Sequence, residues 1–151
     1  MPPAMTDMPP IDSSAYECVT DMAVLDNWIE DIIATGYVAI DTETDGLDAV
    51  SCRLVGISLA TRPGHACYIP LAHGITEGLA LADHVPSQLA EADVLARLKP
   101  PLQDASIMKI LQNAKFDLQV LGQSMIKVHP VEDTMLMSYV LDAGKNRHNM
   151  D

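Results

Sequence analysis

The chain has 151 residues, of which 48% are hydrophobic and 20% charged, so it is long enough to bury a core and too apolar for wholesale disorder. Its formal net charge of −12 argues against a nucleic-acid binder that relies on a basic patch, unless cations held by the acidic residues bind the phosphates. No apolar run reaches the ~18 residues of a membrane span, and three widely separated cysteines fit a reducing cytoplasm.

The first part of the chain predicts a linker followed by a helix and a strand. Residues 1–15 are rich in proline and small polar residues, so we expect a flexible N-terminal linker before a single domain of residues 16–151. Apolar residues recur at helical spacing over 21–33, with Thr20 as the expected cap and Gly36 at the end. The apolar run 37–40 predicts a buried strand that leads into Asp41.

The remaining elements predict a mixed α/β fold in which a strand meander precedes crossover units. Two strands separated by a short turn, residues 54–60 and 66–70, form an antiparallel hairpin. A helix is expected over 88–98, where Pro100 and Pro101 would stop it. The elements expected after it are a strand at 107–111, a helix at 114–121 closed by Gly122, a brief strand at 127–131, and a helix at 134–141 followed by Gly144.

Two carboxylates stand at the end of the strand that begins at residue 37. Asp41 and Glu43 are two residues apart, so on a strand they point to the same face. Such a pair repels unless a proton or a cation lies between them, and Mg²⁺ prefers carboxylate oxygens. The alternative is a solvated acidic turn, because Asp45, Gly46 and Asp48 follow directly.

A third carboxylate follows a later strand. Asn113 occupies the position of a helix N-cap, and Asp117 lies four residues on, near the same helix face. The helix dipole alone would favour a carboxylate in this first turn, so a structural role is the alternative. If both strands share one sheet, Asp117 would meet Asp41 and Glu43 at the strand ends.

Taken together, these segments resemble a known family. Residues 40–48, IDTETDGLD, resemble the first exonuclease motif of family A DNA polymerases, and residues 112–117, QNAKFD, resemble the second. The proofreading domain of these polymerases is also similar to the segments at 54–59, 68–73, 133–144 and 147–151. Each motif is weak alone, but their order and spacing together are specific.

The resemblance implies a ribonuclease-H-like mixed sheet flanked by helices and a two-metal 3′→5′ exonuclease. Asp41, Glu43 and Asp117 match catalytic carboxylates that bind two Mg²⁺ or Mn²⁺ ions. Leu47 matches an apolar residue that packs on the terminal base, and Asn113 matches a position lining the strand path. The implied partners are single-stranded DNA 3′ ends and a polymerase domain in a longer protein.

One family motif has no counterpart in its expected place. The family's fourth carboxylate lies in a Tyr-x-x-x-Asp sequence on a later helix, so we expect a C-terminally truncated domain with weak or no activity. Tyr139 and Asp142 have one residue too few between them; we expect Tyr139 in the core and Asp142 at a helix end. Asp133 is expected to cap its own helix.

Two other functions remain open from the sequence. Truncation would leave a catalytically silent structural or interaction domain, although Asp41, Glu43 and Asp117 are all present. An RNA exonuclease resembling ribonuclease D would share the metal-binding motifs. The segments between the motifs resemble the polymerase domain more closely.

Overall fold

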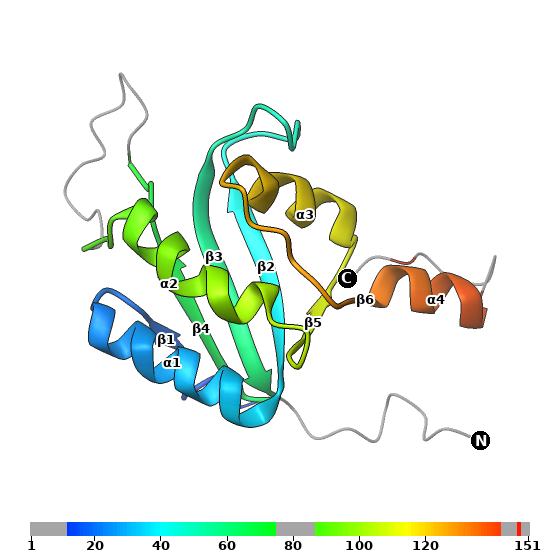
Figure 1. Ribbon diagram of the computed structural model, residues 1–151, viewed down its shortest axis with the longest axis horizontal. Coiled ribbons are helices and arrows are strands. Elements are labelled where there is room, and N and C mark those ends of the chain that lie inside the picture. Colours follow the sequence, from blue (N-terminus) through cyan, green and yellow to red (C-terminus); the bar gives the residue numbers. More distant parts are fainter. Residues whose placement is uncertain (1–11, 75–86, 143–147, 149–151) are drawn as a thin grey trace.

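The computed structural model describes residues 12–74, 87–142 and 148, and these form one mixed sheet with four helices (Figure 1). The strands are β1 (Glu17–Cys18), β2 (Tyr37–Thr44), β3 (Leu54–Arg62), β4 (His65–Pro70), β5 (Met108–Leu111) and β6 (Val131–Asp133). The helices are α1 (Met22–Thr35), α2 (Glu91–Gln103), α3 (Ala114–Gln123) and α4 (Thr134–Asp142).

The sheet has the strand order β1-β4-β3-β2-β5-β6. Strands β2, β3 and β4 form an antiparallel meander, whereas β5 joins β2 and β6 joins β5 in parallel. Each parallel strand is reached through a helix, because parallel neighbours need a crossover connection. The predicted α/β fold, with a hairpin meander followed by crossover units, is therefore confirmed.

Helices α1, α2 and α3 lie on the same face of the sheet (Figure 1). Because the helices cover one face only, the burial of side chains alternates along β2. Val38, Ile40 and Thr42 are buried on the face that the helices cover. On the opposite face, Asp41 is half-buried and Glu43 is exposed. The core between the sheet and the helices is built mainly from aliphatic side chains. We call the opposite side of the sheet the open face.

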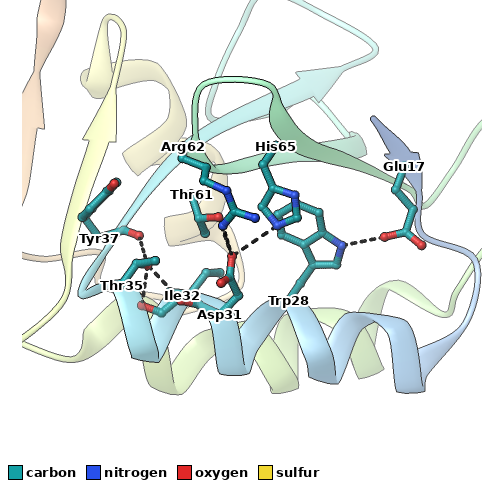
Figure 2. Close-up of polar contacts among 9 residues, drawn as sticks. All are labelled: Glu17, Trp28, Asp31, Ile32, Thr35, Tyr37, Thr61, Arg62 and His65. Atoms are coloured by element: carbon teal, nitrogen blue, oxygen red, sulfur yellow. Dashed lines mark hydrogen bonds and ion pairs between the residues drawn. The ribbon is translucent and has the colours of Figure 1, made fainter. Parts of the chain in front are cut away.

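A polar cluster joins α1 to the hairpin of β3 and β4 (Figure 2). Trp28 of α1 stacks on His65 of β4, with 4.4 Å between ring centroids, and donates its indole N–H to Glu17 of β1. Asp31, one turn further along α1, accepts a hydrogen bond from the Thr61 hydroxyl and lies 3.3 Å from His65 Nε2. These contacts fix the start of the domain against the end of the meander that is remote from Asp41.

The N-terminal boundaries differ from the prediction in two ways. Strand β1 was not predicted, because two exposed residues give no periodic signal; it pairs in parallel with β4. Asp21, not Thr20, caps α1 by accepting a hydrogen bond from the Ala23 N–H. Gly36 ends α1 in the left-handed conformation, as predicted. Most of the expected linker of residues 1–15 lies outside the described residues.

Helix α2 corrects the prediction that two prolines would stop it. The helix begins at Glu91 rather than at residue 88 and continues through Pro100 and Pro101 to Gln103. A proline removes one helical hydrogen bond but already has a helical φ angle. Here Pro101 and Leu102 are buried in the core, and we attribute the continuation to that packing, which outweighs the local cost.

The C-terminal elements are shifted from their predicted bounds. Helix α3 includes Gly122 and ends at Gln123, so the glycine does not close it. Strand β6 begins at Val131, where the predicted strand of residues 127–131 ends. Register with β5 explains the shift, because residues 131–133 are the ones that pair with Lys109 to Leu111. The expected helix-ending residue, Gly144, lies outside the described residues.

Helix α4 projects beside the sheet and contains no buried residue (Figure 1). Tyr139, predicted to lie in the core, has 49% of its surface exposed, so that prediction is wrong. Its ring packs against the ring of His148, with the two centroids 3.8 Å apart. An apolar helix face is buried only where another element packs against it. Among the described residues, no element packs closely enough on α4 to bury any of its side chains.

Lys109 of β5 has a fully buried side chain. Its Nζ donates to the backbone carbonyl oxygens of Asp104 and Ile107, at 2.7 Å each, and to that of His129. Burial lowers the pKa of Lys109, while the nearby Asp104 carboxylate opposes the shift. The side chain thereby joins the loop before β5 to the loop before β6. In the described part of the chain, no helix is long and apolar enough to cross a membrane.

Candidate active site

The topology brings several chain segments together at one edge of the sheet. Strands β2 and β4 both run antiparallel to β3, and β5 runs parallel to β2, so the three have their C-terminal ends at the same edge. In α/β folds, functional side chains gather outside these carboxyl ends. Asp41 and Glu43 lie near the end of β2, and Asp117 lies in the helix that follows β5.

Asp41 and Glu43 share the open face, as their spacing predicted. Across the sheet Asp41 pairs with Ser58 and Glu43 pairs with Gly56. A groove of about 260 Å³ adjoins Asp41, and Ser58 and Gln112 contribute to its walls. The pairing register of β2 with β3 shifts between Glu43 and Thr44, so the regular hydrogen-bond pattern between these strands is interrupted just after the two carboxylates.

Asp117 reaches the same part of β2 from the helix side. The side chain is only 2% exposed, and its Oδ1 accepts two hydrogen bonds from Thr42, at 3.0 Å from the backbone N–H and 2.6 Å from the hydroxyl. Thr42 lies between the two acidic residues and points to the opposite face of the strand. Thr42 therefore fixes Asp117 beside β2.

Asp41 lies within electrostatic range of both other acids. Burial raises the pKa of Asp41, and the charges of Asp117 and Glu43 raise it further. Burial likewise raises the pKa of Asp117, although its hydrogen bonds from Thr42 favour the ionised form and pull the other way. A cation placed among these carboxylates would relieve their repulsion.

The chemistry of these donors fits a hard divalent cation, but their arrangement is incomplete as a binding site. Carboxylate oxygens are the ligands that Mg²⁺ and Mn²⁺ prefer. Nevertheless, no three His, Cys, Asp or Glu side chains within the described residues are arranged to hold a metal ion together. Glu43 is exposed, and Asp117 Oδ1 is turned into its hydrogen bonds with Thr42.

The turn between β5 and α3 is organised by Asp133 rather than by Asn113. Asn113 occupies the N-cap position of α3, as predicted, with a left-handed φ of 58°, but its side chain makes no capping hydrogen bond. The Asp133 carboxylate instead accepts hydrogen bonds from the backbone N–H groups of Asn113 and Ala114. It also accepts one from Met135 in the first turn of α4, which confirms the predicted cap of that helix.

The two expected substrate-binding residues lie at this edge, and within the described ranges neither side chain makes a hydrogen bond. Leu47 follows β2 in a turn and is 97% exposed, which leaves its side chain available for an apolar contact. Asn113 is exposed in the turn before α3. Neither observation identifies a ligand, and their roles remain predictions.

Sequence reasoning missed a residue that holds one of the acids and a polar pair that lies nearby. Thr42 was quoted only as part of a motif, although strand alternation places it on the buried face where it meets Asp117. In the sequence Tyr68 is only part of a resembling segment, and His73 is a lone histidine with no paired spacing. Their hydroxyl and Nε2 atoms lie 2.6 Å apart at the same sheet edge, a contact that no local pattern encodes.

Comparison with known proteins identifies the family. Residues 16–151 match the family described as 3′-5′ exonuclease. The chain is 44% identical over 155 residues to DNA polymerase I of Rhizobium leguminosarum, covering 94% of this chain and 15% of the relative. It is 40% identical over 139 residues to DNA polymerase I of Pseudomonas aeruginosa, covering 90% of this chain and 14% of the relative. The chain thus spans about one-seventh of the length of these relatives.

Solved structures of nucleases share the fold. Brucella melitensis NrnC with bound Mg²⁺ is 26% identical with a TM-score of 0.59, over 89% of this chain and 55% of NrnC. Escherichia coli RNase D matches with a TM-score of 0.61 at 23% identity, over 86% of this chain and 30% of RNase D, which supports the fold alone. The six-stranded mixed sheet with its helices is accordingly the ribonuclease-H-like fold of these exonucleases, and the chain belongs to the 3′-5′ exonuclease family, as a homologue of the exonuclease region of DNA polymerase I.

Proposed function

We propose that this chain is a metal-dependent exonuclease domain that removes nucleotides from the 3′ ends of single-stranded DNA. The observation that carries the proposal is the convergence of Asp41, Glu43 and Asp117 at one sheet edge, where burial and mutual repulsion raise the pKa of Asp41. Membership of the 3′-5′ exonuclease family supplies the reaction class. Similarity to DNA polymerase I of two bacteria favours DNA as the substrate and a polymerase as the context.

Each acidic residue has a distinct part in this proposal. Asp41 and Glu43 would hold Mg²⁺ or Mn²⁺ from the open face, and Asp117 would contribute from the first turn of α3 while Thr42 keeps its carboxylate in place. When bound, such cations lower the pKa of a coordinated water and stabilise the leaving oxygen. Leu47 would pack on the terminal base, and Asn113 would line the path of the strand.

We further propose that the 151-residue chain alone is weakly active or inactive. The family resemblance predicts a fourth carboxylate in a Tyr-x-x-x-Asp sequence, and none of the described helices carries that sequence. Two-metal chemistry requires both ions in register, and misplacing reacting groups by ~1 Å can cost about a hundredfold in rate. The net charge of −12 also predicts poor, salt-sensitive binding of DNA.

An exonuclease assay tests the proposal with two proteins. One is the 151-residue chain, and the other is a chimera in which residues 1–151 precede the corresponding continuation of Rhizobium leguminosarum DNA polymerase I. With Mg²⁺ or Mn²⁺, the chimera should shorten 5′-labelled single-stranded DNA stepwise from its 3′ end, and the short chain should do so slowly or not at all. Asp41→Ala and Asp117→Ala should each lower the chimera's rate by more than about a hundredfold. Asp142→Asn should leave the rate unchanged.

The other outcomes separate the remaining functions. Preferential digestion of RNA of the same sequence would replace DNA with RNA as the substrate, as in a ribonuclease-D-like enzyme. A folded chimera that digests neither nucleic acid would favour a silent structural domain. Rapid digestion by the short chain, lost in Asp142→Asn, would show that Tyr139 and Asp142 complete the site.

A further inference from the structure

Tyr68 places a hydroxyl group on the open face next to the proposed metal site. It belongs to β4 and pairs with Ser58, but its side chain leans along the sheet and covers Gly56 of β3. A β-carbon at Gly56 would lie 1.9 Å from the Tyr68 hydroxyl oxygen, so only glycine leaves room for the phenol in this position. Gly56 is the residue that faces Glu43 across β2 and β3.

This position brings the phenol within reach of Glu43. Facing residues of antiparallel strands have Cα atoms about 4.5–5.5 Å apart, and a glutamate side chain spans that separation. Burial raises the pKa of Tyr68, and the negative charge of Glu43 raises it further, which places the two groups within electrostatic range. No hydrogen bond or ion pair joins Glu43 to another residue in the described part of the chain.

A chain of hydrogen bonds holds the phenol in place. The Tyr68 hydroxyl lies 2.6 Å from His73 Nε2, and the two rings meet edge-on with centroids 5.6 Å apart. The backbone of His73 is held at both polar groups by the Gln88 side chain: its N–H donates at 2.6 Å, and its carbonyl accepts at 3.0 Å. Gln88 therefore holds the backbone of His73, and the His73 ring in turn holds the Tyr68 hydroxyl.

We propose that Tyr68, held by His73, is a positioning residue that orients the Glu43 carboxylate toward a divalent cation. The inference rests on the proposed function, because it assumes that Glu43 is a metal ligand. When His73 Nε2 carries a proton, it donates to the Tyr68 oxygen, and the phenol proton is then directed to Glu43, either directly or through one water. An exposed glutamate loses rotamer freedom when it binds a metal, and a fixed donor reduces that cost.

Binding of Mn²⁺ to the 151-residue chain tests this role without requiring catalysis. Electron paramagnetic resonance measures the free Mn²⁺ in a titration of the wild-type chain and its variants. Tyr68→Phe keeps the ring over Gly56 but removes the hydroxyl, and should weaken Mn²⁺ binding about tenfold, as is typical when the partner of a metal ligand is removed. Tyr37→Phe is the matched control: it removes a phenol from the same face at the far end of β2.

A double-mutant cycle separates positioning from a general effect on the fold. In a Glu43→Gln background, Tyr68→Phe should cause no further loss of affinity, because the residue acts only through Glu43. Gly56→Ala should displace the intact phenol and lower the affinity to a similar extent. Urea denaturation in the absence of metal identifies any unfolded variant, and if Tyr68→Phe is unfolded, His73→Ala provides the same comparison.

The outcomes distinguish this inference from the function on which it rests. If wild type binds Mn²⁺, Asp41→Ala abolishes binding, and folded Tyr68→Phe binds within twofold of wild type, the positioning role is wrong and the metal site stands. An equal loss on adding Tyr68→Phe to the Glu43→Gln variant would also overturn it. If the wild type binds no Mn²⁺, or Asp41→Ala binds equally well, the proposed metal site fails, and the positioning role fails with it.

Discussion

Asp41 combines partial burial with two acidic neighbours. The charges of Asp117 and Glu43 both oppose ionisation of its carboxyl group. The sequence predicted the shared face of Asp41 and Glu43, because alternation along a strand is a local property. It did not predict how Asp117 is held, because the hydrogen bonds from Thr42 join residues 75 positions apart.

The raised pKa of Asp41 predicts how stability depends on pH. The folded state binds a proton at Asp41 more readily than the unfolded state does, so the free energy of unfolding rises as pH falls from neutral through the raised pKa. This gain is complete near the ordinary value of 3.8. Asp12, Asp48 and Asp104 have lowered pKa values, so their contributions are lost only below that value.

Urea denaturation between pH 7 and about pH 4, without divalent ions, measures the effect. Asp41→Asn removes the repelling charge, so it should be more stable than wild type at pH 7 and should gain less stability on acidification. Glu30→Gln, an exposed change in α1, controls for the loss of one negative charge elsewhere. A pH dependence in Asp41→Asn as steep as that of wild type would contradict the electrostatic account of the site.

One side chain, that of Asp133, caps the N-terminal ends of both α3 and α4. Asp133 ends β6 and accepts hydrogen bonds from backbone N–H groups at the beginnings of both helices. The sequence predicted its cap of α4, since an acidic residue stood directly before that helix. Its cap of α3 could not be predicted, because the pairing of β5 with β6 brings the two helix starts together.

Removing this double cap should destabilise the domain measurably. Asp133→Ala leaves N–H groups of two helices without their acceptor, and should lower the free energy of unfolding by about 1–2 kcal/mol. Asp133→Asn retains an acceptor oxygen and should recover most of that loss. The midpoints of urea denaturation give both values. Equal midpoints for wild type and Asp133→Ala would show that the helix starts are satisfied by other groups.

Element boundaries were predicted best where local signals agreed with tertiary packing. The meander of β2, β3 and β4 followed from apolar runs and a short turn, and Gly36 ended α1 as expected. Prolines misled the prediction of α2 because burial of Pro101 favours continuation of the helix. Tyr139 was misjudged because the apolar pattern of α4 does not reveal which neighbours cover it.

The strand topology explains how Asp41 and Glu43, which are close in sequence, come to lie near the distant residue Asp117. Antiparallel β3 returns the chain so that β4 and β2 finish at the same end of the sheet, and α3 begins just after β5 at that end. The fold class followed from the order of the elements. The meeting of the three acids depended on the strand order β3-β2-β5, which the sequence alone left conditional.

The charge of the whole chain is consistent with cations acting between the protein and phosphate. Asp and Glu outnumber Lys and Arg by 21 to 9, so long-range electrostatics oppose binding of a polyanion. Divalent cations at Asp41, Glu43 and Asp117 would reverse the sign of the local charge around these acids. We therefore propose that these three carboxylates form one metal site.

Anomalous scattering from crystals of the 151-residue chain soaked in Mn²⁺ tests that claim most directly. We predict an anomalous difference peak on the open face, within about 2.6 Å of carboxylate oxygens of both Asp41 and Glu43 and on the side nearest Asp117. The peak should disappear in crystals of Asp41→Ala. Saturating Mn²⁺ that leaves no peak between Asp41 and Glu43, or a peak that persists in Asp41→Ala, would contradict the account.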